Sequence, residues 1–105
     1  MPTDRIKQLQ QYCDEDPSDP FNLYALALEY RMIDPDKTRE LFDLLLNRHP
    51  DYLPTYYHAA KFFQDTGNND KAASLYERGI ILAKKLQDNK AHRELRSAYD
   101  EMMFE

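Results

Sequence analysis

Several kinds of residue are scarce in this sequence of 105 amino acids, and each scarcity excludes a class of protein. A single cysteine, Cys13, excludes an intrachain disulfide and a thiol-rich metal site. Only two glycines are present, whereas all-β domains place glycine at many of their turns, so helices are favoured. No apolar run approaches the roughly 18 residues of a membrane-spanning helix.

Basic residues are fewer than acidic ones. The chain has 14 Lys and Arg against 19 Asp and Glu, which gives a net charge of −5. Nucleic-acid phosphates and anionic membrane surfaces attract clustered Lys and Arg, so we expect neither as a partner. The polar first residues, MPTDRIKQLQQYC, lack the apolar region of a secretory signal. We therefore expect a cytoplasmic protein.

The residues that are present favour helices. Apolar side chains recur at spacings of three and four, which places them on one face of a helix. The sequence predicts an all-α fold of about six helices with short connections, and hence antiparallel neighbours. The whole chain is expected to form one domain, with a helix at 3–16, helix pairs at 21–52 and 54–86, and a closing helix at 89–105. Within the first pair, the first helix is expected to cover 21–33 and the second to begin at Asp34 and Pro35.

The two helix pairs share a pattern of large and small side chains. The second pair carries the pattern at Tyr56, Ala59, Ala60, Phe63, Ala72 and Tyr76. The first pair carries a looser version at Leu23, Leu26, Ala27, Tyr30, Thr38 and Phe42. Leu23 precedes Tyr56 by 33 residues. Small residues allow two helices to approach closely, and large ones fill the space beside them, so each pair is expected to pack in the same way.

This pattern resembles the tetratricopeptide repeat, a helix–turn–helix unit of about 34 residues. The resemblance covers Phe21 to Leu82, and the polar sequence TGNN occupies the turn of the second repeat. It implies an α-solenoid of antiparallel helix–turn–helix repeats, with the flanking helices acting as caps. The last helix departs from the pattern, because Lys84 stands where the repeat has a proline.

The resemblance also implies where a partner would bind. Arrays of this family present a concave groove, lined by the first helix of each repeat, that binds peptides or helices of partner proteins. The positions expected to line it are Phe21, Tyr24, Leu28, Arg31, Tyr57, His58, Lys61 and Gln64. Their mixed apolar and basic character favours an amphipathic or mildly acidic peptide. The alternative is that the last helix covers Phe21, Tyr24 and Leu28.

No pattern typical of an active site or a cofactor site is readable. The three histidines lack the i, i+4 spacing of a helical zinc site, and the glycines form no phosphate-binding loop. We therefore expect neither catalysis nor a cofactor nor a metal. The interpretation is a non-catalytic module for protein–protein interaction.

Two other functions remain open from the sequence. Met102, Met103 and Phe104 give the last helix more apolar surface than a solvated cap needs, which would suit self-assembly, for example as a homodimer. The chain could also serve as an accessory domain of a larger enzyme or complex.

Overall fold

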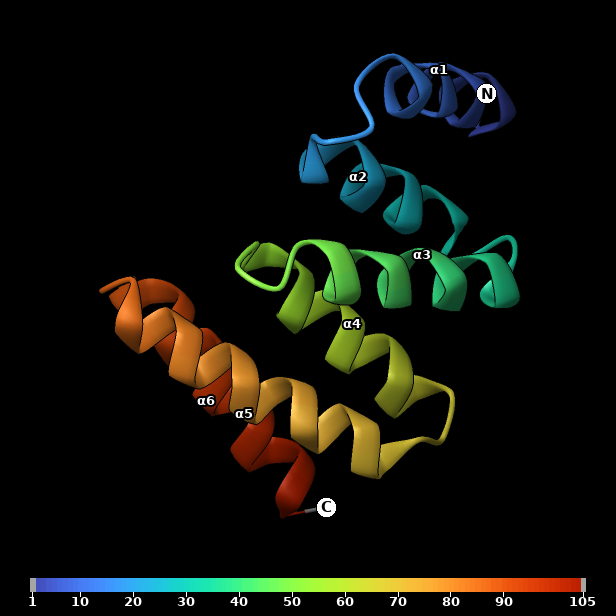
Figure 1. The fold of residues 1–105 in the computed structure, drawn as a ribbon. Coiled ribbons are helices and arrows are strands. Elements are labelled where there is room, and N and C mark those ends of the chain that lie inside the picture. The colour runs from blue at the N-terminus through green and yellow to red at the C-terminus, as the bar shows by residue number, and fades with distance from the viewer. Residues whose placement is uncertain (1, 105) are drawn as a thin grey trace. The chain divides into compact units, whose positions relative to one another are not determined.

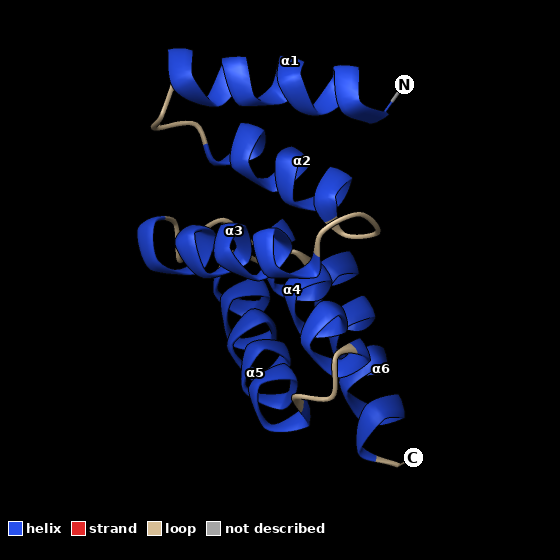
Figure 2. Ribbon diagram, turned by 90° about the vertical axis from the view of Figure 1, so that its right-hand side faces the viewer, coloured by secondary structure: helices blue, strands red, loops and turns tan. Residues whose placement is uncertain are grey.

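The chain is helical throughout most of its length in the computed structural model, which describes residues 2–104 and the side chains from Asp4 onward (Figure 1). The helices are α1 (Pro2–Glu15), α2 (Pro20–Tyr30), α3 (Pro35–Arg48), α4 (Pro54–Asp65), α5 (Asn69–Lys85) and α6 (Asn89–Met103). Within 2–104 there is no strand (Figure 2). The predicted all-α fold of six helices is confirmed. Among these helices, none is long and apolar enough to cross a membrane.

The helices pack in two compact units. The first, Met1–Tyr52, contains α1, α2 and α3, and the second, Leu53–Glu105, contains α4, α5 and α6. Inside each unit every helix packs against the next one along the chain. That the whole chain behaves as a single domain stays a prediction.

The core of the first unit is built from the apolar faces of its three helices. The buried side chains are Leu9, Cys13, Leu23, Ala25, Leu26, Ala27, Thr38, Leu41, Phe42 and Leu45. Thr38 satisfies its buried hydroxyl by donating to the carbonyl oxygen of Asp34 at 2.9 Å. Burial raises the pKa of the Cys13 thiol, and the nearby carboxylates of Asp14 and Asp19 raise it further. Cys13 is thus held as a neutral thiol among apolar side chains.

The core of the second unit contains the predicted repeat residues. Tyr56, Ala59, Ala60, Phe63, Ala72 and Tyr76 are all buried. Gly79 of α5 marks a close approach of the neighbouring helices. A Cβ atom built at Gly79 would lie 2.8 Å from the Cβ of Tyr56 and 3.2 Å from each δ-carbon of Leu95. The missing side chain therefore lets α4 and α6 pack directly against the backbone of α5.

Polar residues before the helices fix where most of them begin. The carboxylate of Asp34 accepts a hydrogen bond from the backbone N–H of Lys37, as expected for an N-cap. Asp19, Asn68 and Asp88 cap α2, α5 and α6 in the same way. Leu53 precedes α4 and supplies no side-chain cap, so Pro54 in the first turn takes a larger part in starting that helix.

The predicted end of α2 is wrong by three residues. The sequence pattern extends the helix to Ile33, whereas α2 ends at Tyr30. The N–H groups of Ile33 and Asp34 both donate to the carbonyl oxygen of Tyr30, which closes a turn. Asp34 precedes a proline and is extended, with φ −145° and ψ 92°. A helix cannot continue into that residue, so the chain turns before it.

Two tight turns use left-handed backbone conformations. Gly67 has φ +88° after α4, and Gln87 has φ 59° after α5. In both turns the next N–H reaches back to a carbonyl of the last helical turn, from Asn68 to Phe63 and from Asp88 to Ala83. This is the usual hydrogen bonding of a helix end followed by a left-handed residue. The glycine suits that conformation, whereas Gln87 adopts it with some strain.

Candidate functional site

In the second unit, α4 buries one face and exposes another. Tyr57 is 37% exposed, and Lys61 is exposed one turn further along the helix. The ring of Tyr57 meets the ring of His58 edge to face, with centroids 5.4 Å apart. Gln64 is half-buried, and its Oε1 accepts a hydrogen bond from the Tyr76 hydroxyl at 3.3 Å. Of the four residues of α4 that were predicted to bind, Tyr57 and Lys61 are therefore exposed, whereas His58 and Gln64 are half-buried.

Tyr57 also lines a shallow hollow that it shares with α6. The hollow has a volume of about 300 Å³, and its other lining residues are Arg93, Glu94, Ser97, Ala98 and Glu101. Apart from Ala98, these residues are polar or charged, and they offer both donors and acceptors around one aromatic side chain. We call this hollow the α4–α6 groove.

The residues that α6 contributes were not among the predicted site residues. The last helix does not follow the repeat pattern, so its lining positions could not be read by comparison with α2 and α4. One signal was available in the sequence. Arg93, Ser97 and Glu101 follow one another at intervals of four, which places them on one polar face of a helix.

In the first unit, the predicted residues of α2 differ in how much surface they expose. Phe21 is 55% exposed, whereas Tyr24 and Leu28 are half-buried. The ring of Tyr24 packs edge to face on Tyr52, with centroids 5.7 Å apart. Burial raises the pKa of Tyr24, and Tyr52 raises it further while Arg31 opposes the effect. Arg31 is exposed, but it lies after the end of α2 rather than within the helix.

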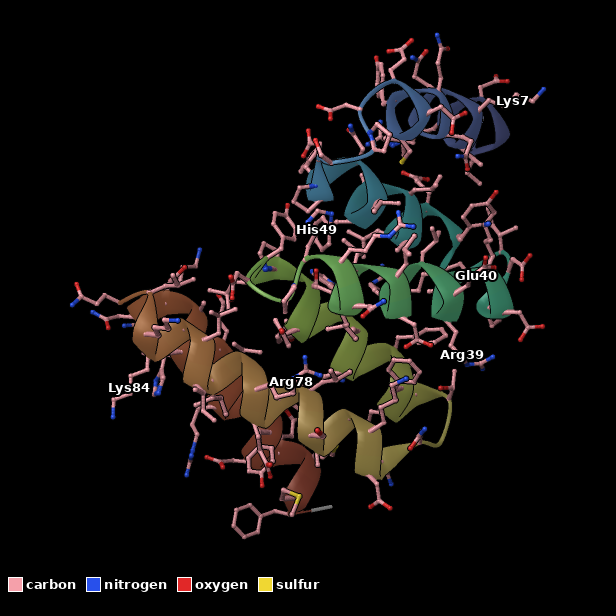
Figure 3. The ribbon with its side chains drawn as sticks, viewed as in Figure 1. Lys7, Arg39, Glu40, His49, Arg78 and Lys84 are labelled. Carbon is pink, nitrogen blue, oxygen red and sulfur yellow. The ribbon has the colours of Figure 1, made fainter. Side chains whose placement is uncertain are left out.

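The first unit has a hollow of its own, which lies near Tyr52. It measures about 310 Å³ and is lined by Pro20, Arg48, His49, Pro50, Asp51 and Tyr52. Figure 3 labels His49, which is the C-cap of α3. Its Nε2 is buried and has no hydrogen-bond partner among the described residues. Nothing in the sequence pattern pointed to this hollow.

The described residues contain no group of three or more His, Cys, Asp or Glu side chains placed to hold a metal ion. The surfaces of the two units combine aromatic rings with charged and amide groups. Such a combination suits recognition of another polypeptide, because aromatic anchors provide contact area and polar groups fix orientation.

Comparison with known proteins supports the repeat fold. No protein-family model matches the sequence, and a comparison with curated proteins gives no match. Among solved structures, the chain is similar to a tetratricopeptide repeat domain protein from Salinibacter ruber. Its solution NMR structure is 35% identical, with a TM-score of 0.77 over 83% of this chain and 89% of that chain. A crystal structure of a tetratricopeptide repeat domain protein from the same organism gives 34% identity and a TM-score of 0.76, over 81% of this chain and 97% of that chain.

A further likeness concerns the fold alone. A solution structure of a protein from Bordetella parapertussis is 17% identical, with a TM-score of 0.78 over 93% of this chain and 86% of that chain.

The buried repeat residues, the helix–turn–helix pairs and the identity to the Salinibacter protein agree with one another. The chain belongs to the tetratricopeptide repeat family.

Proposed function

We propose that this protein is a non-catalytic module that binds a peptide or a helix of a partner protein. Helical repeat proteins build binding surfaces from the helices that successive repeats present. The observation that carries the proposal is the α4–α6 groove, where an exposed tyrosine stands among side chains of both charges. We place the protein in the cytoplasm, because its single cysteine is buried and takes part in no disulfide.

The proposal assigns different roles to the residues that line the α4–α6 groove and to those of α4 beside it. Tyr57 provides a rigid aromatic surface, the kind of residue that often dominates binding energy. Lys61, on the next turn of α4, would attract a carboxylate of the peptide. Arg93 and Glu101 on α6 would set the register by pairing with side chains of opposite sign. His58 and Gln64 were also predicted to bind. We propose that they hold the exposed face of α4 in place, His58 through its ring contact with Tyr57 and Gln64 through its hydrogen bond with Tyr76.

In the first unit, Phe21 is the proposed anchor. It is 55% exposed, whereas Tyr24 and Leu28 are half-buried, and its backbone N–H donates to the Asp19 carboxylate at 2.9 Å. The ring is thus attached to a well-defined helix start. Tyr24, Leu28 and Arg31 are proposed to border this anchor.

The test uses the groove variant Tyr57→Ala/Lys61→Ala and the control variant Ser74→Ala/Lys7→Ala. The control residues are exposed and lie outside both proposed surfaces. Partners captured from a cell extract by the unaltered protein are identified by mass spectrometry, and binding of each one is then measured with purified components. We expect the groove variant to keep its helical circular dichroism and to weaken binding by about tenfold or more, whereas the control binds as before. A folded groove variant that binds every partner unchanged would refute this site.

Self-assembly is a second candidate function, and one observation favours it. Met103 and Phe104 are 56% and 88% exposed at the end of α6, next to the buried Met102. Adjacent exposed apolar side chains favour association because contact removes them from water. Light scattering over a range of micromolar concentrations tests the idea. A dimer that Met103→Ser/Phe104→Ser dissociates would support it, and a monomer of 12.5 kDa at every concentration would exclude it.

A further inference from the structure

Three lysines and a histidine lie at the turn between α5 and α6. Lys84 and Lys85 close α5, and Lys90 and His92 lie near the start of α6. The three lysines are exposed and His92 is half-buried. Figure 3 shows the Lys84 side chain extending away from the ribbon. We call these four residues the basic corner.

An open hollow adjoins the basic corner, and Lys84 and His92 are the two corner residues that line it. Its volume is about 490 Å³, and it is lined by Lys84, Gln87, Asn89 and His92. The hollow lies within the size range of many small-ligand sites. All four lining side chains can donate hydrogen bonds, and none is a carboxylate. The hollow therefore suits a group that accepts hydrogen bonds and carries negative charge.

The lysines of the basic corner form no close ion pair with an acid of the described residues. Elsewhere in the chain, exposed cations form pairs, such as Arg39 with Asp36 at 3.0 Å and Arg96 with Asp100 at 3.5 Å. Among the described residues, the three lysines of the corner have no carboxylate oxygen within ion-pair distance. The acid next to them in the sequence, Asp88, accepts a hydrogen bond from the N–H of Ala91 at 3.0 Å and caps α6. Its carboxylate serves the start of the helix and stays charged, as does Glu94 four residues after Lys90. Residues 84–94 still contain four Lys and Arg against two acids, so the corner keeps a positive excess.

The surrounding charge limits what can bind at the corner. Residues 1–52 contain six basic and eleven acidic residues, and residues 53–105 contain eight of each. Outside the three lysines of the corner, residues 53–105 contain five basic and eight acidic residues, so a long polyanion such as nucleic acid would extend onto a net negative surface of the same unit, which repels it. A short acidic segment would contact the lysines alone. Leu86, 52% exposed beside Lys85, adds an apolar contact that favours a peptide over a sugar–phosphate chain.

We propose that the basic corner binds a short acidic peptide segment of a partner protein, one that carries an apolar side chain among its carboxylates. Lys84 and Lys90 attract the carboxylates from the two helices, His92 and Gln87 donate hydrogen bonds in the hollow, and Leu86 contacts the apolar residue. The corner shares no residue with the α4–α6 groove. The inference therefore goes beyond the proposed function, and the two can fail separately.

The experiment measures fluorescence anisotropy with a labelled peptide of alternating Glu-Glu-Leu units and with a matched peptide in which Lys replaces Glu. The test variant is Lys84→Glu/Lys90→Glu. The control is Lys7→Glu/Lys37→Glu, which changes the net charge equally but lies in the first unit. We expect the acidic peptide alone to bind, and the test variant to bind it at least about tenfold more weakly in low salt, whereas the control does not. Raising the salt to about 0.3 M should weaken binding by the unaltered protein strongly, because exposed charges are screened.

Further measurements test the position of the site and the nature of its occupant. The groove variant Tyr57→Ala/Lys61→Ala should bind the acidic peptide normally, which separates this site from the proposed groove. Equal losses in the test and control variants, or no binding to the unaltered protein, would overturn the proposal. It would also be overturned by tighter binding of a single-stranded oligonucleotide of equal charge.

A dimer detected by light scattering and abolished only by Lys84→Glu/Lys90→Glu would make a second copy the occupant and would refute a separate partner. Circular dichroism confirms that each variant is folded, and the milder Lys84→Gln/Lys90→Gln should lose part of the binding.

Discussion

Gly79 offers a direct test of how the second unit packs, because two physical effects oppose each other there. In an isolated helix, replacing glycine by alanine stabilises by about 1 kcal/mol. In this structure the new methyl group would lie 2.8 Å from the Cβ of Tyr56 and 3.2 Å from both δ-carbons of Leu95. Carbon atoms normally pack at about 3.5–4.0 Å, so both contacts are too short.

The neighbours of Gly79 can yield to different degrees. The Leu95 δ-carbons are the far end of a flexible side chain and can rotate, although Leu95 is only 2% exposed. The Cβ of Tyr56 is attached to the backbone of α4, so the helix itself must move. Overpacking of this kind costs about 1–3 kcal/mol. After subtracting the gain in helix propensity, we expect Gly79→Ala to destabilise the protein by about 1 kcal/mol.

Urea unfolding followed by circular dichroism measures this change, and an unaltered slope with urea would show that the unfolded surface is the same. Ser74→Ala is the matched control, because Ser74 lies on the exposed face of the same helix. It should stabilise by a few tenths of a kcal/mol through helix propensity alone. If Gly79→Ala were stabilising by about the full propensity gain, α4 and α6 would not approach α5 as closely as described, and the reasoning would be refuted.

Three further predictions follow from single groups. The buried hydroxyl of Thr55 has no hydrogen-bond partner among the described residues, so Thr55→Val should raise the free energy of unfolding by about 1 kcal/mol in urea. A lower free energy of unfolding in Thr55→Val would contradict this reasoning. Asp34→Ala removes the cap of α3 and should cost about 1 kcal/mol, whereas Asp34→Ser should restore most of it. Burial raises the pKa values of Tyr24 and Tyr52 above the ordinary value of 10.0, so both favour the neutral form in the folded state. The free energy of unfolding should not depend on these groups below pH 10 and should fall as the pH rises above 10. The fall should be less steep in Tyr52→Phe, and an unchanged fall would exclude Tyr52 as a cause.

The core and the helix order could be predicted from the sequence because both depend on local spacing. The positions of Ala59, Ala60 and Phe63 on one face of a helix follow from the number of residues per turn, and all three are buried. Proline and Asp at the helix starts gave most boundaries within one or two residues. The end of α2 was missed because apolar residues continue to Ile33, and the turn before Asp34 depends on backbone hydrogen bonds that spacing does not reveal.

The candidate surfaces were harder to predict, because exposure depends on what neighbouring elements cover. Position in the repeat selects Tyr24 and Gln64 as readily as Tyr57. In the structure Tyr24 packs on Tyr52, and Gln64 accepts a bond from Tyr76. The residues of α6 could not be selected by their position in a repeat, since that helix lacks the repeat pattern.

These intrachain contacts bear on where binding energy would concentrate. A partner that engaged Tyr24 or Gln64 fully would have to replace contacts that each side chain already makes within its own unit, so the net gain from either would be small. Tyr57 presents more than a third of its surface, and Phe21 more than half. Among the described residues neither side chain forms a hydrogen bond, and the edge contact of Tyr57 with His58 leaves its exposed surface open, so burying these rings displaces water at little cost. We therefore expect Phe21 and Tyr57, rather than every residue at a lining position, to determine affinity.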